Sequence, residues 1–218
     1  MSESVQFLGG NASGHLERPS GRVRAGVVVI QEWWGLVPHI EDVTARFAKE
    51  GYLALAPDLY HGKKTVEAEE AQHLMEGLDW GLAVRELTGA VDYLRGQGCE
   101  KVGVVGFCMG GALAVLAAAQ SGVDAAVSFY GFPPDASAVA KPCPPTQIFF
   151  GADEGFFDVG AARAWAKQQA TQGKATAVTI FEGAGHAFFN DTRQEVYRPA
   201  AAKEAWAKTL AHFARCLA

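Results

Sequence analysis

The residues with the clearest chemical potential surround Cys108, which lies between two glycines in the order Gly106, Phe107, Cys108, Met109, Gly110. This Gly-x-Cys-x-Gly spacing is the pattern of a nucleophile elbow, where the reactive side chain stands on a sharp strand-to-helix turn. Glycines are needed on both sides because side chains there would collide with the neighbouring strand and helix. Cys108 is therefore a candidate nucleophile at a helix N-terminus, a position that favours a thiolate.

Two other interpretations of this turn were weighed against the elbow. A buried free cysteine commonly acts as a small hydrophobic residue, but the bracketing glycines and the abrupt strand-to-helix change favour a chemical role. A glycine-rich turn can also hold a phosphate. Neither G-x-G-x-x-G nor G-x-x-x-x-G-K-[ST] is present in the chain, so we set a nucleotide site aside.

Three further candidates follow other predicted strands: Glu32 beside two tryptophans, Asp153, and His186. The carboxyl ends of parallel strands meet at one edge of a sheet, so we expect all three to converge with Cys108. The order Cys108, Asp153, His186 is that of a nucleophile, its acid and its histidine. Each alone has a structural alternative: a paired buried carboxylate for Glu32, a turn residue for Asp153, and a packed or exposed ring for His186. No spacing of metal ligands occurs, and we predict neither a metal nor a cofactor.

The elements that position these residues alternate between apolar runs and helical patterns. The expected elements are a leading hairpin within residues 5–23, strands at 25–30, 53–56, 102–105, 125–129, 147–150 and 176–181, and helices at 40–50, 82–94, 112–119, 159–172 and 199–213. Residues 61–81 are polar, with a weak helical pattern near 66–75, and are a candidate insertion over a site. This alternation predicts an α/β fold, a mostly parallel sheet with helices on both faces, in one domain over residues 1–218.

Composition limits the classes of partner. The chain has 218 residues, of which 49% are apolar and 20% charged, an ordinary globular balance. A net charge of −5 gives no electrostatic reason to expect nucleic acid or an anionic membrane as a partner. The first residues lack a signal-peptide pattern, and the four cysteines have no Cys-x-x-Cys spacing, so we expect reduced thiols and a cytoplasmic location.

Several motifs together resemble the dienelactone hydrolase family, the carboxymethylenebutenolidases of the α/β-hydrolase superfamily. They are Gln31–Glu32–Trp33–Trp34–Gly35, Pro57–Asp58–Leu59–Tyr60, Gly106–Phe107–Cys108–Met109–Gly110–Gly111, Gly151–Ala152–Asp153 and Gly185–His186–Ala187–Phe188. The resemblance implies a compact α/β-hydrolase without a large cap, working through a triad of Cys108, His186 and Asp153. It also implies that Glu32 interacts with the resting nucleophile, and that the backbone N–H groups of Trp33 and Met109 form the oxyanion hole.

The expected substrate is a small activated ester or lactone, cleaved through a thioester acyl-enzyme. Family members that act on dienelactone hold its carboxylate with arginines, but Asn190 stands four residues after the histidine, and no arginine occurs between Phe47 and Val84. We predict a pocket lined by Trp34, Tyr130, Phe132 and Asn190 that prefers neutral esters.

Other functions for the same residues stay open at this point. The triad could act on an organophosphate triester or a thioester, or the fold could serve a non-catalytic ligand-binding protein or a thiol redox sensor. We expect a monomer or a small homo-oligomer.

Overall fold

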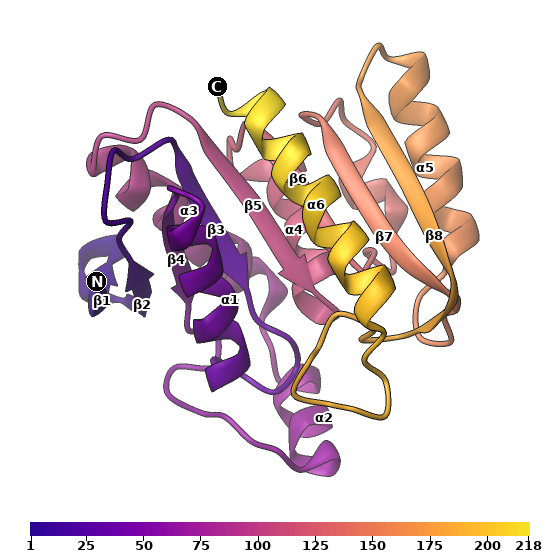
Figure 1. The fold of residues 1–218 in the computed structure, drawn as a ribbon, viewed down its shortest axis with the longest axis horizontal. Helices are drawn as coiled ribbons and strands as arrows, with labels where there is room; N and C mark the ends of the chain where they lie inside the picture. The colour runs from indigo at the N-terminus through magenta and orange to yellow at the C-terminus, as the bar shows by residue number, and fades with distance from the viewer.

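Eight strands form one sheet in the computed structural model, which describes all 218 residues (Figure 1). The strands are β1 (Ser2–Phe7), β2 (Ala12–Glu17), β3 (Gly26–Ile30), β4 (Leu53–Pro57), β5 (Val102–Phe107), β6 (Ala125–Phe129), β7 (Thr146–Asp153) and β8 (Thr176–Gly185). Their order across the sheet is β1-β2-β4-β3-β5-β6-β7-β8. Strands β3 to β8 pair in parallel, whereas β1, β2 and β4 pair antiparallel at one edge. The predicted leading hairpin and the mostly parallel sheet are both confirmed.

Helices cover the two faces of this sheet. They are α1 (Pro38–Lys49), α2 (Ala68–Glu76), α3 (Trp80–Gly96), α4 (Met109–Gln120), α5 (Val159–Thr171) and α6 (Pro199–Cys216). In Figure 1, α1 and α6 cross in front of the sheet, α3, α4 and α5 lie behind it, and α2 stands apart below the carboxyl ends of the strands. None of these helices is both long enough and apolar enough to cross a bilayer.

Some elements extend beyond the predicted bounds for identifiable reasons. Helix α3 begins at Trp80 because the Asp79 side chain accepts a hydrogen bond from the Leu82 N–H at 2.9 Å, which caps the helix. Strand β8 continues past residue 181 because its pairing with β7 resumes after an irregularity near Gly151, where Asp153 faces Gly185. This irregularity lies directly beside the candidate site.

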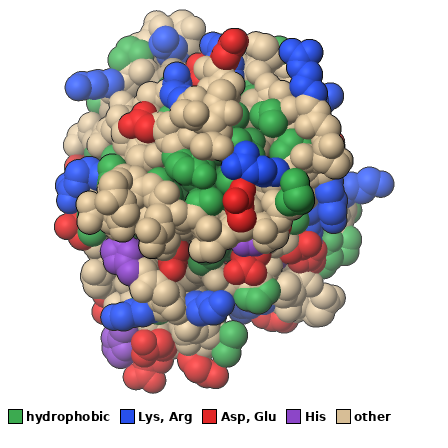
Figure 2. Space-filling view, turned by 90° about the vertical axis from the view of Figure 1, so that its left-hand side faces the viewer, with side chains coloured by type: hydrophobic (Ala, Val, Ile, Leu, Met, Phe, Trp, Pro, Cys, Tyr) green, Lys and Arg blue, Asp and Glu red, His purple; other side chains and the backbone are tan.

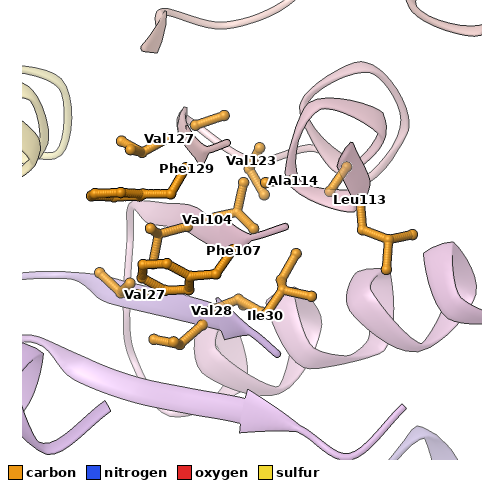
Figure 3. Packing of buried hydrophobic residues seen from close by; sticks show 14 of the residues in the cluster. Val27, Val28, Ile30, Val104, Phe107, Leu113, Ala114, Val123, Val127 and Phe129 are labelled. Carbon is orange, nitrogen blue, oxygen red and sulfur yellow. The ribbon is translucent and has the colours of Figure 1, made fainter. Parts of the chain in front are cut away.

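Part of the core lies where β3, β5 and β6 meet α4, as Figure 3 shows for Val28, Val104, Phe107 and Phe129. Helix α4 is buried from Met109 to Ala118, which explains why its sequence is apolar on every side. Burial of this extent makes the β5–α4 junction one of the most constrained places in the molecule.

Candidate active site

Cys108 occupies the junction between β5 and α4 with a strained backbone, at φ 55° and ψ −119°. Neighbouring glycines make this turn possible: a Cβ on Gly106 would overlap the carbonyl oxygen of Gly110, and a Cβ on Gly131 would overlap that of Cys108. The strand, the sharp turn and the helix therefore have the geometry predicted from the Gly-x-Cys-x-Gly spacing. The cysteine side chain is partly exposed and lines a cavity.

The surroundings of Cys108 favour the neutral thiol. Burial raises the pKa of this thiol well above its usual range, and the charges of Glu32 and Glu154 raise it further. Hydrogen bonds from the backbone N–H groups of Met109 and Trp33 act in the opposite direction. In the resting site, burial and the two carboxylates therefore outweigh the expected stabilisation of a thiolate by the helix N-terminus.

His186 follows β8, and its ring is held from several sides. Its Nδ1 lies 3.0 Å from each carboxylate oxygen of Glu154, whose side chain is only 1% exposed. The edge of Tyr130 meets the ring with centroids 5.0 Å apart, and Phe157 stacks on it at 5.8 Å. Because Nδ1 is occupied by the carboxylate, Nε2 is the nitrogen available for chemistry.

The acid beside the histidine differs from the one predicted. Asp153 was expected to contact His186, but it is solvent-exposed at the cavity rim, and the contact is made by Glu154. The pairing of β7 with β8 shifts here from Gly151–Phe181 to Asp153–Gly185, so His186, which follows Gly185, lies beside Glu154, which follows Asp153. The sequence signal for Glu154 was its position next to Asp153 at the same strand end.

Glu32 is 1% exposed and accepts two hydrogen bonds. Tyr130 Oη donates to its Oε1 at 3.2 Å, and Asn190 Nδ2 donates to its Oε2 at 2.7 Å. Tyr130 and Asn190 were predicted to contact substrate, which is wrong for this structure: both are buried and neither lines the cavity. They lie behind the carboxylate and hold it in place.

The cavity beside Cys108 and His186 has a volume of about 870 Å³ and mostly apolar walls. Trp34 and Phe132 line it as predicted from the sequence, and Trp33 lines it as well. Aromatic walls that the sequence analysis did not identify come from Trp80, Phe156 and Phe157.

Helix α2 and the residues after it form one wall of this cavity through Ala68, Met75 and Trp80. The expectation that residues 61–81 lie over a site is thereby confirmed. The opposite side of α2 carries exposed glutamates, and acidic side chains gather at the lower end of the face in Figure 2, the level of α2 in Figure 1. One side of the segment thus faces the cavity and the other faces water.

Two arginines also reach the cavity, and both have partners. The Arg193 guanidinium lies 5.4 Å from the Trp34 ring centroid and forms an ion pair with Glu195 at 2.8 Å. Arg198 donates hydrogen bonds to the carbonyl oxygens of Gly183, Glu195 and Tyr197. No group of three or more His, Cys, Asp or Glu side chains has the arrangement of a metal site.

The strand order, the cysteine elbow and the histidine–carboxylate pair define an α/β-hydrolase. The model of the dienelactone hydrolase family matches residues 13–217, so the chain belongs to that family and is a hydrolase of the ester and lactone class. It is 36% identical to the protein usf of Aquifex pyrophilus over 98% of each chain. It is also 36% identical to a carboxymethylenebutenolidase of Pseudomonas putida, over 59% of each chain.

Solved structures share the fold over nearly the whole chain. A dienelactone hydrolase from Anabaena variabilis superposes with a TM-score of 0.74 at 23% identity, covering 100% of this chain and 99% of that one. A dienelactone hydrolase-like promiscuous phosphotriesterase, P91, from metagenomic libraries superposes with a TM-score of 0.89 at 23% identity, with the same coverage. At these identities the similarity establishes the architecture.

Proposed function

We propose that the protein hydrolyses activated esters or lactones with Cys108 as nucleophile, His186 as general base and acid, and Glu154 as the carboxylate that orients the histidine. The observation that carries the proposal is the shared cavity. Cys108 and His186 both line it, and the buried Glu154 holds the Nδ1 side of the ring. This arrangement has the roles of a nucleophile, a base and an orienting group.

Catalysis starts when the Cys108 sulfur attacks the substrate carbonyl while the thiol proton passes to His186 Nε2. The N–H groups of Met109 and Trp33, which point at the sulfur, stabilise the negative oxygen of the tetrahedral intermediate. The C–O bond then breaks, the leaving oxygen takes the proton from His186, and a thioester remains on Cys108. Water activated by His186 attacks this thioester, which releases the acid and restores the thiol.

The use of a sulfur nucleophile has a consequence for substrate choice. A thiolate is itself a good leaving group, so the tetrahedral intermediate returns to substrate when the other leaving group is poor. Enol esters, aryl esters and lactones with a stabilised leaving oxygen are therefore favoured over alkyl esters and amides.

Trapping the acyl-enzyme tests the mechanism. Acid quenching during turnover of p-nitrophenyl acetate is expected to leave an acetyl group on Cys108, found by peptide mass mapping. In His186→Gln the acetyl group should form far more slowly, because no base is present to accept the thiol proton during attack. An acetyl group on another residue, with Cys108 unmodified, would contradict the assignment.

A second prediction concerns the charge of the substrate. Asn190 is neutral and buried, Arg193 is already paired with Glu195, and the Arg198 guanidinium is hydrogen-bonded to three carbonyl oxygens, so a substrate carboxylate loses water with no unoccupied guanidinium to receive it. We expect kcat/KM for a neutral aryl ester to exceed that for an anionic dienelactone by about tenfold or more, a difference of about 1.4 kcal/mol.

The matched variants for this comparison are Arg193→Gln and Arg198→Gln, because both arginines line the cavity. Neither should change turnover of the neutral ester by more than about threefold, since only a charged substrate would gain from a cation. A preference for the anionic lactone that disappears in one of these variants would instead place a carboxylate site on that arginine.

A further inference from the structure

Glu32 is held in the buried site by two neutral groups. Its two carboxylate oxygens accept separate hydrogen bonds, from a tyrosine hydroxyl on one side and an asparagine amide on the other. None of the ion pairs in the molecule involves Glu32. A buried carboxylate without a cationic partner is unusual, because such a charge is costly unless something compensates it.

The asparagine on one side has a fixed orientation. Asn190 Oδ1 accepts hydrogen bonds from the Thr192 backbone N–H at 3.1 Å and from its hydroxyl at 2.6 Å. Turning the amide around would place its NH₂ group against the Thr192 N–H donor, so the NH₂ group must face Glu32. Asn190 is 2% exposed, which leaves its side chain little room to move.

The tyrosine on the other side is equally constrained. Tyr130 directly follows β6 at φ 40°, and its N–H donates to the Phe149 carbonyl oxygen at 2.6 Å. Its ring packs between Phe188, at a centroid distance of 5.5 Å, and His186, at 5.0 Å. Tyr130 is fully buried, and its positive φ strains the backbone at this position.

We propose that Tyr130 and Asn190 are positioning residues that hold Glu32 in place with neutral hydrogen bonds, so that its negative charge stays directed at the Cys108 sulfur instead of being cancelled by a cation. The proposal rests on the proposed function, in which Cys108 is the nucleophile. One donor on each carboxylate oxygen fixes the orientation of the group. Because the donors carry no charge, they leave the field of the carboxylate largely intact.

The ionisable groups that act on Cys108 come from five elements of the sheet. They are Glu32 after β3, Tyr60 after β4, Tyr130 after β6, Glu154 after β7 and His186 after β8. Burial raises the pKa of both tyrosines, which are therefore neutral, and Glu154 is shared with His186. Glu32 is the one carboxylate here without a basic partner, so it dominates the charge on the thiol.

As a consequence, the Cys108 thiol of the resting protein resists alkylation and oxidation. Since Glu32 is fixed on both sides, substrate binding does not have to displace it. The thiol proton leaves only when His186 accepts it during attack on a bound carbonyl. This coupling ties reactivity to the presence of substrate.

Tyr130→Phe tests the proposal by removing only the hydroxyl, and Asn190→Leu removes the other donor with similar volume. Loss of either donor frees the Glu32 carboxylate to turn away from the thiol, which weakens the negative field that raises the pKa of Cys108. We expect iodoacetamide to alkylate Cys108 about three- to tenfold faster than in the wild type near pH 6.5, where tenfold corresponds to one pKa unit.

Glu32→Gln is the reference variant, and Tyr52→Phe is the matched control. Glu32→Gln should accelerate alkylation about tenfold, because no negative charge from this position remains beside the thiol. Tyr52 is a buried tyrosine packed on Phe47 and Phe213, away from the cavity, and its variant should react like the wild type. In Glu32→Gln, adding Tyr130→Phe should have no further effect, because the hydroxyl acts through the carboxylate.

The outcomes separate the proposal from the function on which it rests. Wild-type alkylation profiles in Tyr130→Phe and Asn190→Leu, together with acceleration in Glu32→Gln, would overturn the positioning role. An effect of Tyr130→Phe that persists in Glu32→Gln would overturn it too, since that effect would come from packing. Full ester turnover after complete alkylation of Cys108 would instead overturn the proposed function.

Discussion

Replacing Cys108 with alanine is expected to lower kcat/KM for an activated ester by about 10⁴-fold or more while leaving the fold intact. The sulfur forms the bond to the acyl group, and no neighbouring side chain has the geometry to take its place. The hydroxyl of Tyr60, the last residue of the Pro57–Asp58–Leu59–Tyr60 motif, donates to the Met109 sulfur and does not line the cavity. Cys108→Ser should also lose most activity, because a neutral hydroxyl is a weaker nucleophile and needs a stronger base.

Stability measurements distinguish lost chemistry from lost fold. Cys108 has φ 55°, which glycine adopts without strain, so Cys108→Gly should be at least as stable to urea as Cys108→Ala. Elsewhere glycine would be less stable than alanine by about 0.5–1 kcal/mol in a regular element. Both variants should be inactive. If a variant is unfolded without denaturant, its loss of activity says nothing about the role of Cys108 as nucleophile.

Chemical modification gives an independent check on the same thiol. Of the other cysteines, Cys99 and Cys143 are buried, and burial raises the pKa of Cys143 to about 11. Alkylation should therefore reach the partly exposed Cys216 first, and Cys108 more slowly because the pKa of its thiol is raised. We expect loss of activity to follow modification of Cys108 alone. Complete inactivation with Cys108 unmodified would rule it out as the nucleophile.

Much of the fold could be predicted because its signals are local. Short Val-rich and Ala-rich runs bounded by glycine or proline give the strands of a buried sheet, and strands of this kind alternate with helices along the chain. The elbow was predictable for the same reason, since Gly106 and Gly110 lie within a few residues of Cys108 and their small size is required by backbone contacts there.

The partners within the site were harder to predict because they depend on long-range packing. A two-residue shift in the pairing of β7 with β8, with the extra residues on β8, sets which acid lies beside His186, and nothing local marks it. Asn190 lies 158 residues from Glu32 along the chain, and Tyr130 lies 98 residues away. Their aromatic and amide side chains suggested contact with substrate, whereas burial behind Glu32 gives them a different role.

The state of the thiol was also beyond local reasoning. A helix N-terminus favours a thiolate wherever it is solvated, but this one lies beside the buried Glu32 and begins at the buried Met109. Desolvation disfavours the charged form more strongly than the helix favours it. The degree of burial is a property of the packed fold and is not encoded in the neighbouring residues.

Glu154→Gln is expected to lower kcat for an activated ester by about 10³- to 10⁴-fold, because a carboxylate that orients a catalytic histidine also fixes its tautomer. The amide of Gln can donate to His186 Nδ1, which would place the ring proton on Nε2, where the base must accept one. KM should change far less than kcat, since Glu154 does not line the cavity that receives the substrate. Glu154→Asp should retain part of the activity, because it keeps the charge while shortening the reach.

Asp153→Asn is the matched control, since it neutralises the adjacent carboxylate with the same change of chemistry. Asp153 is exposed at the rim of the cavity, so this variant should keep kcat within about threefold of the wild type. Steady-state kinetics of both variants on p-nitrophenyl acetate, with urea unfolding to confirm that each is folded, decide between the two acids. A large loss in Asp153→Asn with near-normal turnover in Glu154→Gln would reverse the assignment. That result would require the loop after β7 to rearrange when substrate binds, bringing Asp153 rather than Glu154 against the His186 ring.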